Sequence, residues 1–131
     1  LMKENPDFLS APVNLGILYN KTGRIPAAEG ILKGVVKADA KNIIAYNYLG
    51  ILYRQEGKFQ EAESAYKKAI AIDSGYANAY LNLGILYDLY LQNYPAALEN
   101  YKHFQALVMK DKGEEDKEVK KWIFDLKSRM K

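Results

Sequence analysis

Few residues of this 131-residue chain have the types and spacing that covalent chemistry requires. His103 is the only histidine and the sequence contains no cysteine, so a usual zinc site, a disulfide and a thiol nucleophile are all excluded. No serine, aspartate or glutamate near His103 has a recognisable catalytic spacing. We therefore expect no catalytic residues, no metal site and no cofactor, and a protein that is not an enzyme.

Side chains suited to polypeptide binding recur more regularly. Ile17, Ile51 and Ile85 are spaced 34 residues apart, and asparagines accompany them. An asparagine amide both donates and accepts hydrogen bonds, as the backbone of an extended peptide requires. Tyr48 adds apolar contact, and Arg54 could pair with an acidic side chain or a terminal carboxylate. We call this set the candidate stripe: Asn14, Ile17, Asn47, Tyr48, Ile51, Arg54, Asn78, Asn82 and Ile85.

The elements that position the candidate stripe are built from a repeat. The pentapeptide Leu-Gly-Ile-Leu-Tyr occurs at residues 15–19, 49–53 and 83–87, so successive copies start 34 residues apart. Such a period is typical of one helix–turn–helix unit used three times. Stacked units form an extended surface, which favours binding over catalysis.

Within each unit the apolar spacing predicts two helices. Leu15, Leu18 and Tyr19 lie on one face of the first helix at three- and four-residue spacing, and the later units repeat this pattern. Because a helix turns about 100° per residue, the candidate stripe lies on the opposite face. Glycine after the first helix, at Gly23 and Gly57, predicts a turn. The third unit carries one extra residue near 88–93 and lacks this glycine.

These residues resemble the tetratricopeptide repeat, which pairs Leu-Gly and Tyr on a first helix with small and aromatic residues on a second. The middle unit matches at Tyr46, Leu49, Gly50, Tyr53, Gly57, Ala62, Tyr66 and Ala69. Its neighbours match at Leu15, Gly16, Tyr19, Gly23 and Ala28, and at Tyr80, Leu83, Gly84, Tyr87, Ala97 and Tyr101. The terminal segment is similar to the capping helix of bacterial members, so the resemblance implies a bacterial protein.

The resemblance implies an all-α, right-handed α-solenoid of three helix–turn–helix units with a C-terminal capping helix. The expected organisation is a remnant of a preceding repeat at 1–8, then units at 9–42, 43–76 and 77–111, and the capping helix at 112–131. All of these segments are expected to form one domain. In this family the first helices line a concave groove, so the candidate stripe would form its floor.

Composition narrows the class of partner. The net charge of +3 comes from interspersed charges of both signs, which argues against a nucleic-acid partner. No apolar run has the roughly 20 residues that a membrane span requires, so no direct membrane insertion is expected. The chain begins with Leu-Met, and we expect its start to be cut from a longer protein. Both a cytoplasmic and a periplasmic location remain open.

The sequence predicts a non-enzymatic scaffold that binds a peptide segment or a partner protein in the groove. The alternative is a self-assembling module that forms homo-oligomers through its stack ends within a larger bacterial complex. Removal of an upstream repeat is expected to expose an apolar end near Val13 and Leu32 and to encourage such contacts artificially. Chaperone-binding members of the family grip a terminal carboxylate with lysine, arginine and asparagine. Val13, Ile17 and Tyr48 stand where a lysine and two asparagines would be required, so that role is excluded.

Overall fold

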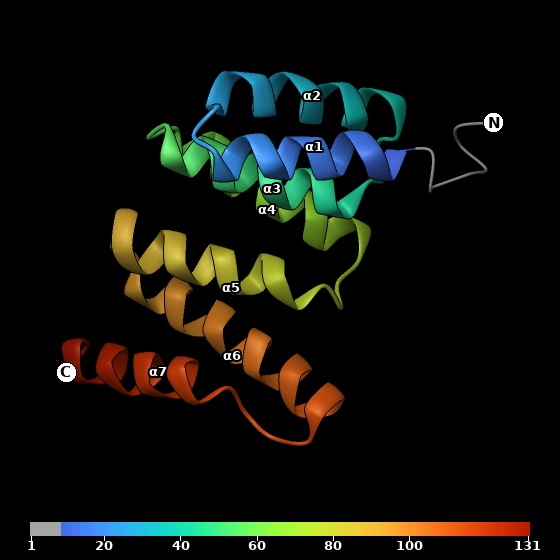
Figure 1. Cartoon of the computed structure of the whole chain (residues 1–131). Helices are drawn as coiled ribbons and strands as arrows, with labels where there is room; N and C mark the ends of the chain where they lie inside the picture. The colour runs from blue at the N-terminus through green and yellow to red at the C-terminus, as the bar shows by residue number, and fades with distance from the viewer. Residues whose placement is uncertain (1–8) are drawn as a thin grey trace. The chain divides into compact units, whose positions relative to one another are not determined.

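The computed structural model describes residues 9–131, and every regular element in this range is helical (Figure 1). The α-helices are α1 (Ser10–Lys21), α2 (Ile25–Ala38), α3 (Ile43–Gln55), α4 (Phe59–Ile72), α5 (Ala77–Ile85), α6 (Tyr94–Lys112) and α7 (Lys117–Arg129). A short π-helix, η2 (Leu86–Tyr90), extends α5. The all-α class with three helix pairs and a terminal helix is therefore confirmed. The expected repeat remnant at 1–8 lies outside the described residues.

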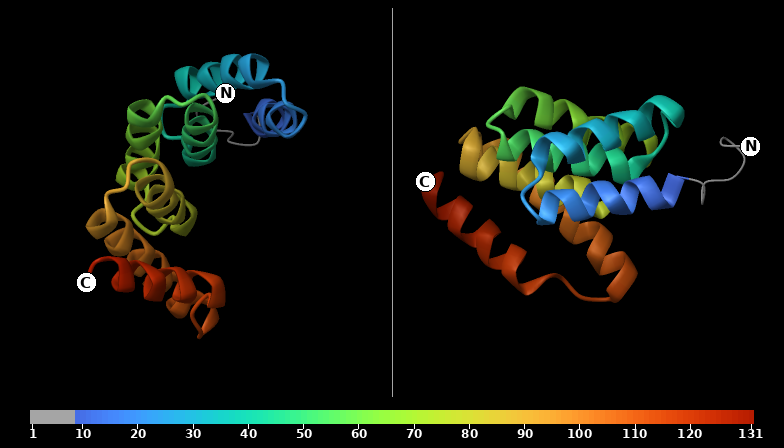
Figure 2. Two further views of the ribbon diagram at one scale, coloured as in Figure 1. Left: turned by 90° about the vertical axis from the view of Figure 1, so that its left-hand side faces the viewer. Right: turned by 45° about the horizontal axis from the view of Figure 1, so that its top comes forward.

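The described residues divide into two compact parts, 9–73 and 74–131. In the first part α1 pairs with α2 and α3 pairs with α4, while α3 also contacts α2 and α1. In the second part α5 pairs with α6, and α7 lies along α6, as the three views agree (Figures 1 and 2). Each first helix thus packs against its own second helix, as the repeat predicts.

The turns inside the first two pairs are made by left-handed glycines. Gly23 has a φ of 80° and Gly57 a φ of 78°, values that a residue with a side chain adopts only under strain. The chain then enters the second helix, where Pro26 occupies the first turn of α2. The sequence prediction of glycine-terminated first helices is correct at both positions.

Close packing within each pair depends on a second set of glycines. A Cβ added to Gly50 would lie 2.6 Å from Cδ1 of Tyr66 on α4, and one added to Gly84 would lie 2.5 Å from Cε1 of Tyr101 on α6. Both tyrosines are almost completely buried. The aromatic ring on the second helix therefore fills the space that the glycine leaves open.

The third pair departs from the repeat in a defined way. Its extra residue is accommodated by the π-helix η2, since a π-helix spreads one turn over an additional residue. Gln92, with a φ of 51°, takes the left-handed position that glycine holds in the other pairs. The irregularity seen in the sequence is thus a widened helical turn followed by a strained link.

The first helix differs from its counterparts in what covers it. Leu15 and Leu18 are 39% and 54% exposed, whereas Leu49 and Leu52 on α3 are 4% and 0% exposed. The expectation that Leu15 and Leu18 face the paired helix is wrong. In the first part α2 packs against α3, and no described helix precedes α1 to cover the same face.

The apolar end expected near Val13 and Leu32 also differs from the prediction. Both side chains are buried in the core of the first part, together with Ala28 and Val35. The exposed apolar surface at this end is formed by Leu15 and Leu18 instead.

Specific hydrogen bonds hold the terminal helix on α6. The buried side chain of Gln105 donates from Nε2 to the carbonyl of Asp116 at 2.8 Å and accepts from its N–H at 2.9 Å. Asp116 in turn caps α7 by accepting from the N–H groups of Glu118 and Val119. Val119 and Leu126 of α7 are buried.

Candidate functional site

In the first part, the candidate stripe is a half-exposed apolar surface on α1 and α3. Ile17, Tyr48 and Ile51 are each partly buried, and Ile17 and Tyr48 pack against the core cluster. The two helices contact each other directly, so these side chains share one surface. They combine fixed positions with apolar area left open to solvent.

The polar members of the stripe in this part differ in accessibility. Asn14 is exposed and Arg54 is half-buried. Asn47 is only 3% exposed, so the expectation that it lies in a solvated groove is wrong. The helical-wheel assignment placed it opposite Leu49, but the side of α3 that carries it is also covered. Asn47 is therefore a residue of the protein interior.

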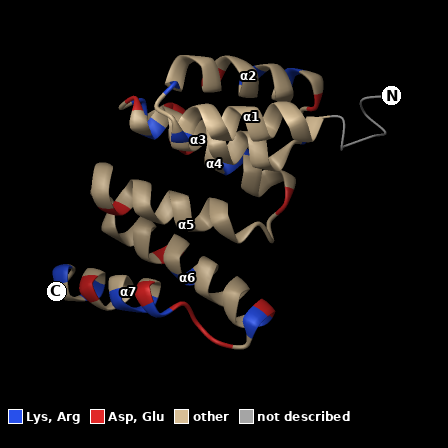
Figure 3. Ribbon diagram, viewed as in Figure 1, with Lys and Arg blue, Asp and Glu red and all other residues tan. Residues whose placement is uncertain are grey.

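In the second part, α5 carries the remaining members of the stripe. Asn78 is exposed, while Asn82 and Ile85 are half-buried. The first helices carry few charges, as Figure 3 shows: α5 has none, and α1 and α3 contribute Lys21 and Arg54. The candidate stripe therefore presents an almost uncharged surface on each part.

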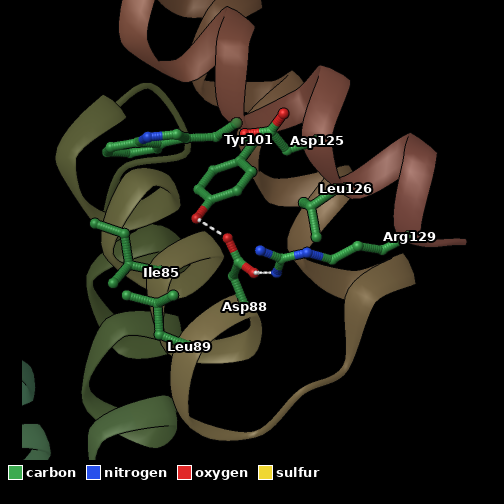
Figure 4. A pocket seen from close by; sticks show the side chains of 8 residues that line it. Ile85, Asp88, Leu89, Tyr101, Asp125, Leu126 and Arg129 are labelled. Atoms are coloured by element: carbon green, nitrogen blue, oxygen red, sulfur yellow. Dashed lines mark hydrogen bonds and ion pairs between the residues drawn. The ribbon is translucent and has the colours of Figure 1, made fainter.

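The second part also contains a pocket that the sequence analysis did not predict (Figure 4). Its volume is about 250 Å³, and it lies between the end of α5, the π-helix η2, α6 and α7. Ile85 of the candidate stripe forms part of its wall. The lining residues are Ile85, Asp88, Leu89, Tyr101, Trp122, Asp125, Leu126 and Arg129.

A short polar chain crosses this pocket. The Tyr101 hydroxyl donates to Oδ2 of Asp88 at 3.0 Å, and Nη1 of Arg129 lies 3.6 Å from Oδ1 of the same carboxylate. Oδ1 is buried and accepts no hydrogen bond. Burial, and secondarily the negative charge of Asp88, raise the pKa of Tyr101, so it remains a protonated donor.

The aromatic residues of the pocket contact each other. The rings of Tyr101 and Trp122 are tilted at 47° with their centroids 5.7 Å apart. Trp122 is half-buried, and this ring contact places it against Tyr101 of α6. It therefore forms a wall of the pocket.

One sequence signal could have indicated this site. Asp88 occupies the repeat position held by Asn20 and Arg54, each 34 residues from the next, so the side chain changes in type at every unit. It lies beside the extra residue of the third unit, and π-helical insertions are frequent at functional sites. The closure of the pocket by α7 could not be inferred from repeat spacing.

Other types of site find no support in the described residues. Across 9–131, no cluster of three or more histidine, aspartate or glutamate residues is arranged to hold a metal ion. His103 is exposed and stacks on Tyr80, with the ring centroids 5.0 Å apart. None of the helices in this range is long and apolar enough to cross a membrane.

Comparisons with known proteins identify the class. Residues 43–76 match the sequence profile of the tetratricopeptide repeat. No curated protein sequence matches the chain. The residues 43–76 coincide with the middle unit expected from the sequence. The chain therefore contains a tetratricopeptide repeat at these residues.

Solved structures share this fold. PcrH in complex with the chaperone-binding region of PopD has a TM-score of 0.87 at 16% identity, covering 97% of this chain and 96% of that one. The first tetratricopeptide domain of Spaghetti (RPAP3), bound to an HSP90 peptide, has a TM-score of 0.82 at 21% identity, covering 93% and 92%. At these identities the likeness establishes the fold.

A third similar structure is more alike in sequence. The MamA protein is 30% identical with a TM-score of 0.69, and the match covers 81% of this chain but 57% of MamA. The similar structures include domains from yeast and human as well as a Yersinia enterocolitica protein. The bacterial origin implied by the terminal helix is therefore not borne out.

Proposed function

We propose that the chain is a non-enzymatic scaffold that binds a peptide segment or a partner protein on the candidate stripe. The observation that carries the proposal is the surface formed by Ile17, Tyr48 and Ile51, which stays half-exposed although Ile17 and Tyr48 also pack against the buried core of the first part. Similar structures hold peptides or partner segments, as PcrH does with part of PopD and RPAP3 with an HSP90 peptide. Asn14, Asn78 and Asn82 would supply hydrogen bonds to the bound backbone.

The direct test uses peptides selected by the protein itself. Peptides from a random library would be selected on the wild-type chain and their affinities measured by fluorescence anisotropy. A charge placed in the apolar surface, as in Ile17→Asp with Ile51→Asp, should weaken binding at least tenfold because the charge loses hydration on contact. Gln60→Asp, an exposed position on α4, is the matched control. Unchanged affinity in the double variant would show that the stripe is not the binding surface.

A second candidate function is self-association through α1. Leu15 and Leu18 are exposed, although the residues at the same repeat positions on α3 are buried under α2. A second copy of the chain could cover this face with an apolar helix, as α2 covers α3. Sedimentation over a range of concentrations should then reveal an oligomer that Leu15→Ser with Leu18→Ser abolishes. Met109→Ser, at an exposed apolar position on α6, should leave the oligomer intact.

A further inference from the structure

We propose that the pocket between α5, η2, α6 and α7 binds the guanidinium side chain of an arginine in the partner polypeptide. This inference rests on the proposed function, because Ile85 belongs both to the candidate stripe and to the pocket wall. A polypeptide lying on α5 would therefore have one side chain in position to enter the pocket.

The size of the pocket suits a side chain rather than a whole ligand. Its volume of about 250 Å³ lies below the roughly 300–1,000 Å³ of small-molecule sites. Ile85, Leu89 and Leu126 provide apolar walls for the methylene stem of a long side chain. The half-buried ring of Trp122 adds an aromatic surface on which a guanidinium can stack.

The charge of the pocket selects a cation. Asp88 and Asp125 contribute two carboxylates against the single guanidinium of Arg129. Oδ1 of Asp88 is a buried acceptor without a hydrogen bond, and the side chain as a whole is only 11% exposed. A buried carboxylate oxygen in this condition is stabilised by an incoming charged donor.

Arg129 indicates which cation the carboxylate accepts. Its guanidinium lies 3.6 Å from Oδ1 of Asp88, longer than the roughly 2.7–2.9 Å of a charge-assisted hydrogen bond. It also lies over the ring of Tyr94 at 6.0 Å, and its side chain is 55% exposed. Because Arg129 is itself half-exposed and its contact with Asp88 is long, a partner arginine can displace it, and Arg129 then leaves the pocket by moving into solvent.

The π-helix explains why the third unit alone has this arrangement. Asp88 lies within η2, and the widened turn carries it opposite Tyr101. The middle unit, which lacks the extra residue, has Arg54 at the same repeat position. The pocket is therefore a property of the third unit rather than of the repeat.

Trp122 provides a direct reporter, since it is the only tryptophan of the chain and lines the pocket. The probe is the blocked pentapeptide Gly-Gly-Arg-Gly-Gly, compared with the same peptide carrying citrulline, which has the shape of arginine without its charge. Titration is followed by tryptophan fluorescence and by the indole N–H resonance. The arginine peptide should bind at least tenfold more tightly than the citrulline peptide, because only it supplies charged donors to Asp88.

Two variants separate the roles of the charges. Arg129→Gln removes the internal competitor and should strengthen binding of the arginine peptide about two- to fivefold. Asp88→Asn should abolish the preference for arginine over citrulline. Thermal melting shows whether the Asp88→Asn protein is folded. If it is not, Asp125→Asn, at an exposed position, provides the second test, because it should reduce the preference for the arginine peptide over the citrulline peptide.

The outcomes distinguish this inference from the proposed function. Equal binding of the arginine and citrulline peptides, or weaker binding by Arg129→Gln, would overturn the arginine pocket. If library-selected peptides still require Ile17 and Ile51, the scaffold function stands although the pocket inference fails. If the wild-type chain binds no library peptide but still prefers the arginine peptide to the citrulline peptide, the candidate stripe is overturned as a binding surface. The inference about the pocket then stands.

Discussion

At the level of single residues, the glycines of the first helices set how closely the two helices of a pair approach. Gly50 faces the buried ring of Tyr66, whereas Gly30 on α2 has no atom within 4 Å of the position where a Cβ would be added. Gly50→Ala should therefore lower the free energy of unfolding by about 1–3 kcal/mol through overpacking. Gly30→Ala should raise it by about 0.5–1 kcal/mol through helix propensity. Urea denaturation of the two variants measures both changes in the free energy of unfolding. Equal effects at Gly50 and Gly30 would contradict the packing role of Gly50.

Tyr101 makes a prediction about alkaline pH. Burial and the charge of Asp88 raise its pKa in the folded state, while an unfolded tyrosine ionises near pH 10. Above pH 10 the unfolded chain thus releases a proton that the folded protein retains, so stability should fall as the pH rises. In Tyr101→Phe this contribution is absent, and the decline of unfolding free energy above pH 10 should be shallower. Urea titrations of both proteins from pH 8 upward measure the difference, and parallel curves would contradict the assignment.

Residue-level prediction from the sequence succeeded where the neighbour is local and failed where it is distant. Gly50 and Tyr66 belong to the same repeat, so the sequence placed them on the paired helices of one unit, although the contact between them came from the structure. Leu15 and Leu49 are identical in local sequence, yet one is exposed and the other buried, because α2 covers only the second. Asn47 likewise carries no local sign of its burial.

At the level of elements, the link after η2 carries strain that the other turns avoid. Gln92 has a φ of 51° where Gly57 has 78°. Gln92→Gly should raise the free energy of unfolding by about 0.5–1 kcal/mol, since glycine adopts this conformation without a steric penalty. The reciprocal change Gly57→Ala should lower it by about 1–2 kcal/mol, although a Cβ there meets no atom within 4 Å. Thermal melts of the two variants should move in opposite directions.

The attachment of α7 depends on one buried amide. Gln105→Leu preserves the size of the side chain but leaves the N–H and carbonyl of Asp116 without their partner. We expect a loss of about 1–3 kcal/mol and faster proteolysis of the segment 113–116. Glu99→Leu, at an exposed position on the same helix, should change neither. Unaltered proteolysis in Gln105→Leu would show that apolar packing of Val119 and Leu126 holds α7 by itself.

The element boundaries followed from the sequence more closely than the site did. Glycine marked the turns of the first two pairs, and the extra residue of the third unit was visible as a break in the period. A π-helix could not be inferred from that break, because a longer loop accommodates the same residue. The pocket required the position of Trp122 and Arg129 on α7, and no repeat spacing specifies where a capping helix lies.

At the scale of the whole molecule, the repeat fold makes stability a local property. Helices contact mainly their neighbours in sequence, so damage to one pair should be felt most strongly within its own part. Gly84→Ala forces a Cβ into the ring of Tyr101 in the second part, and Gly50→Ala forces one into Tyr66 in the first. The two substitutions are chemically identical, and each acts as the control for the other.

Hydrogen exchange should therefore give mirrored patterns. Gly84→Ala should lower amide protection in residues 77–129 by a larger factor than in 10–72, and Gly50→Ala should do the reverse. If both variants lose protection evenly along the chain, the two parts unfold as one cooperative unit, and stability is not a local property of each part. A mirrored result has a consequence for function: a partner bound only to the arginine pocket would protect the second part preferentially, while one lying along the whole candidate stripe would protect both.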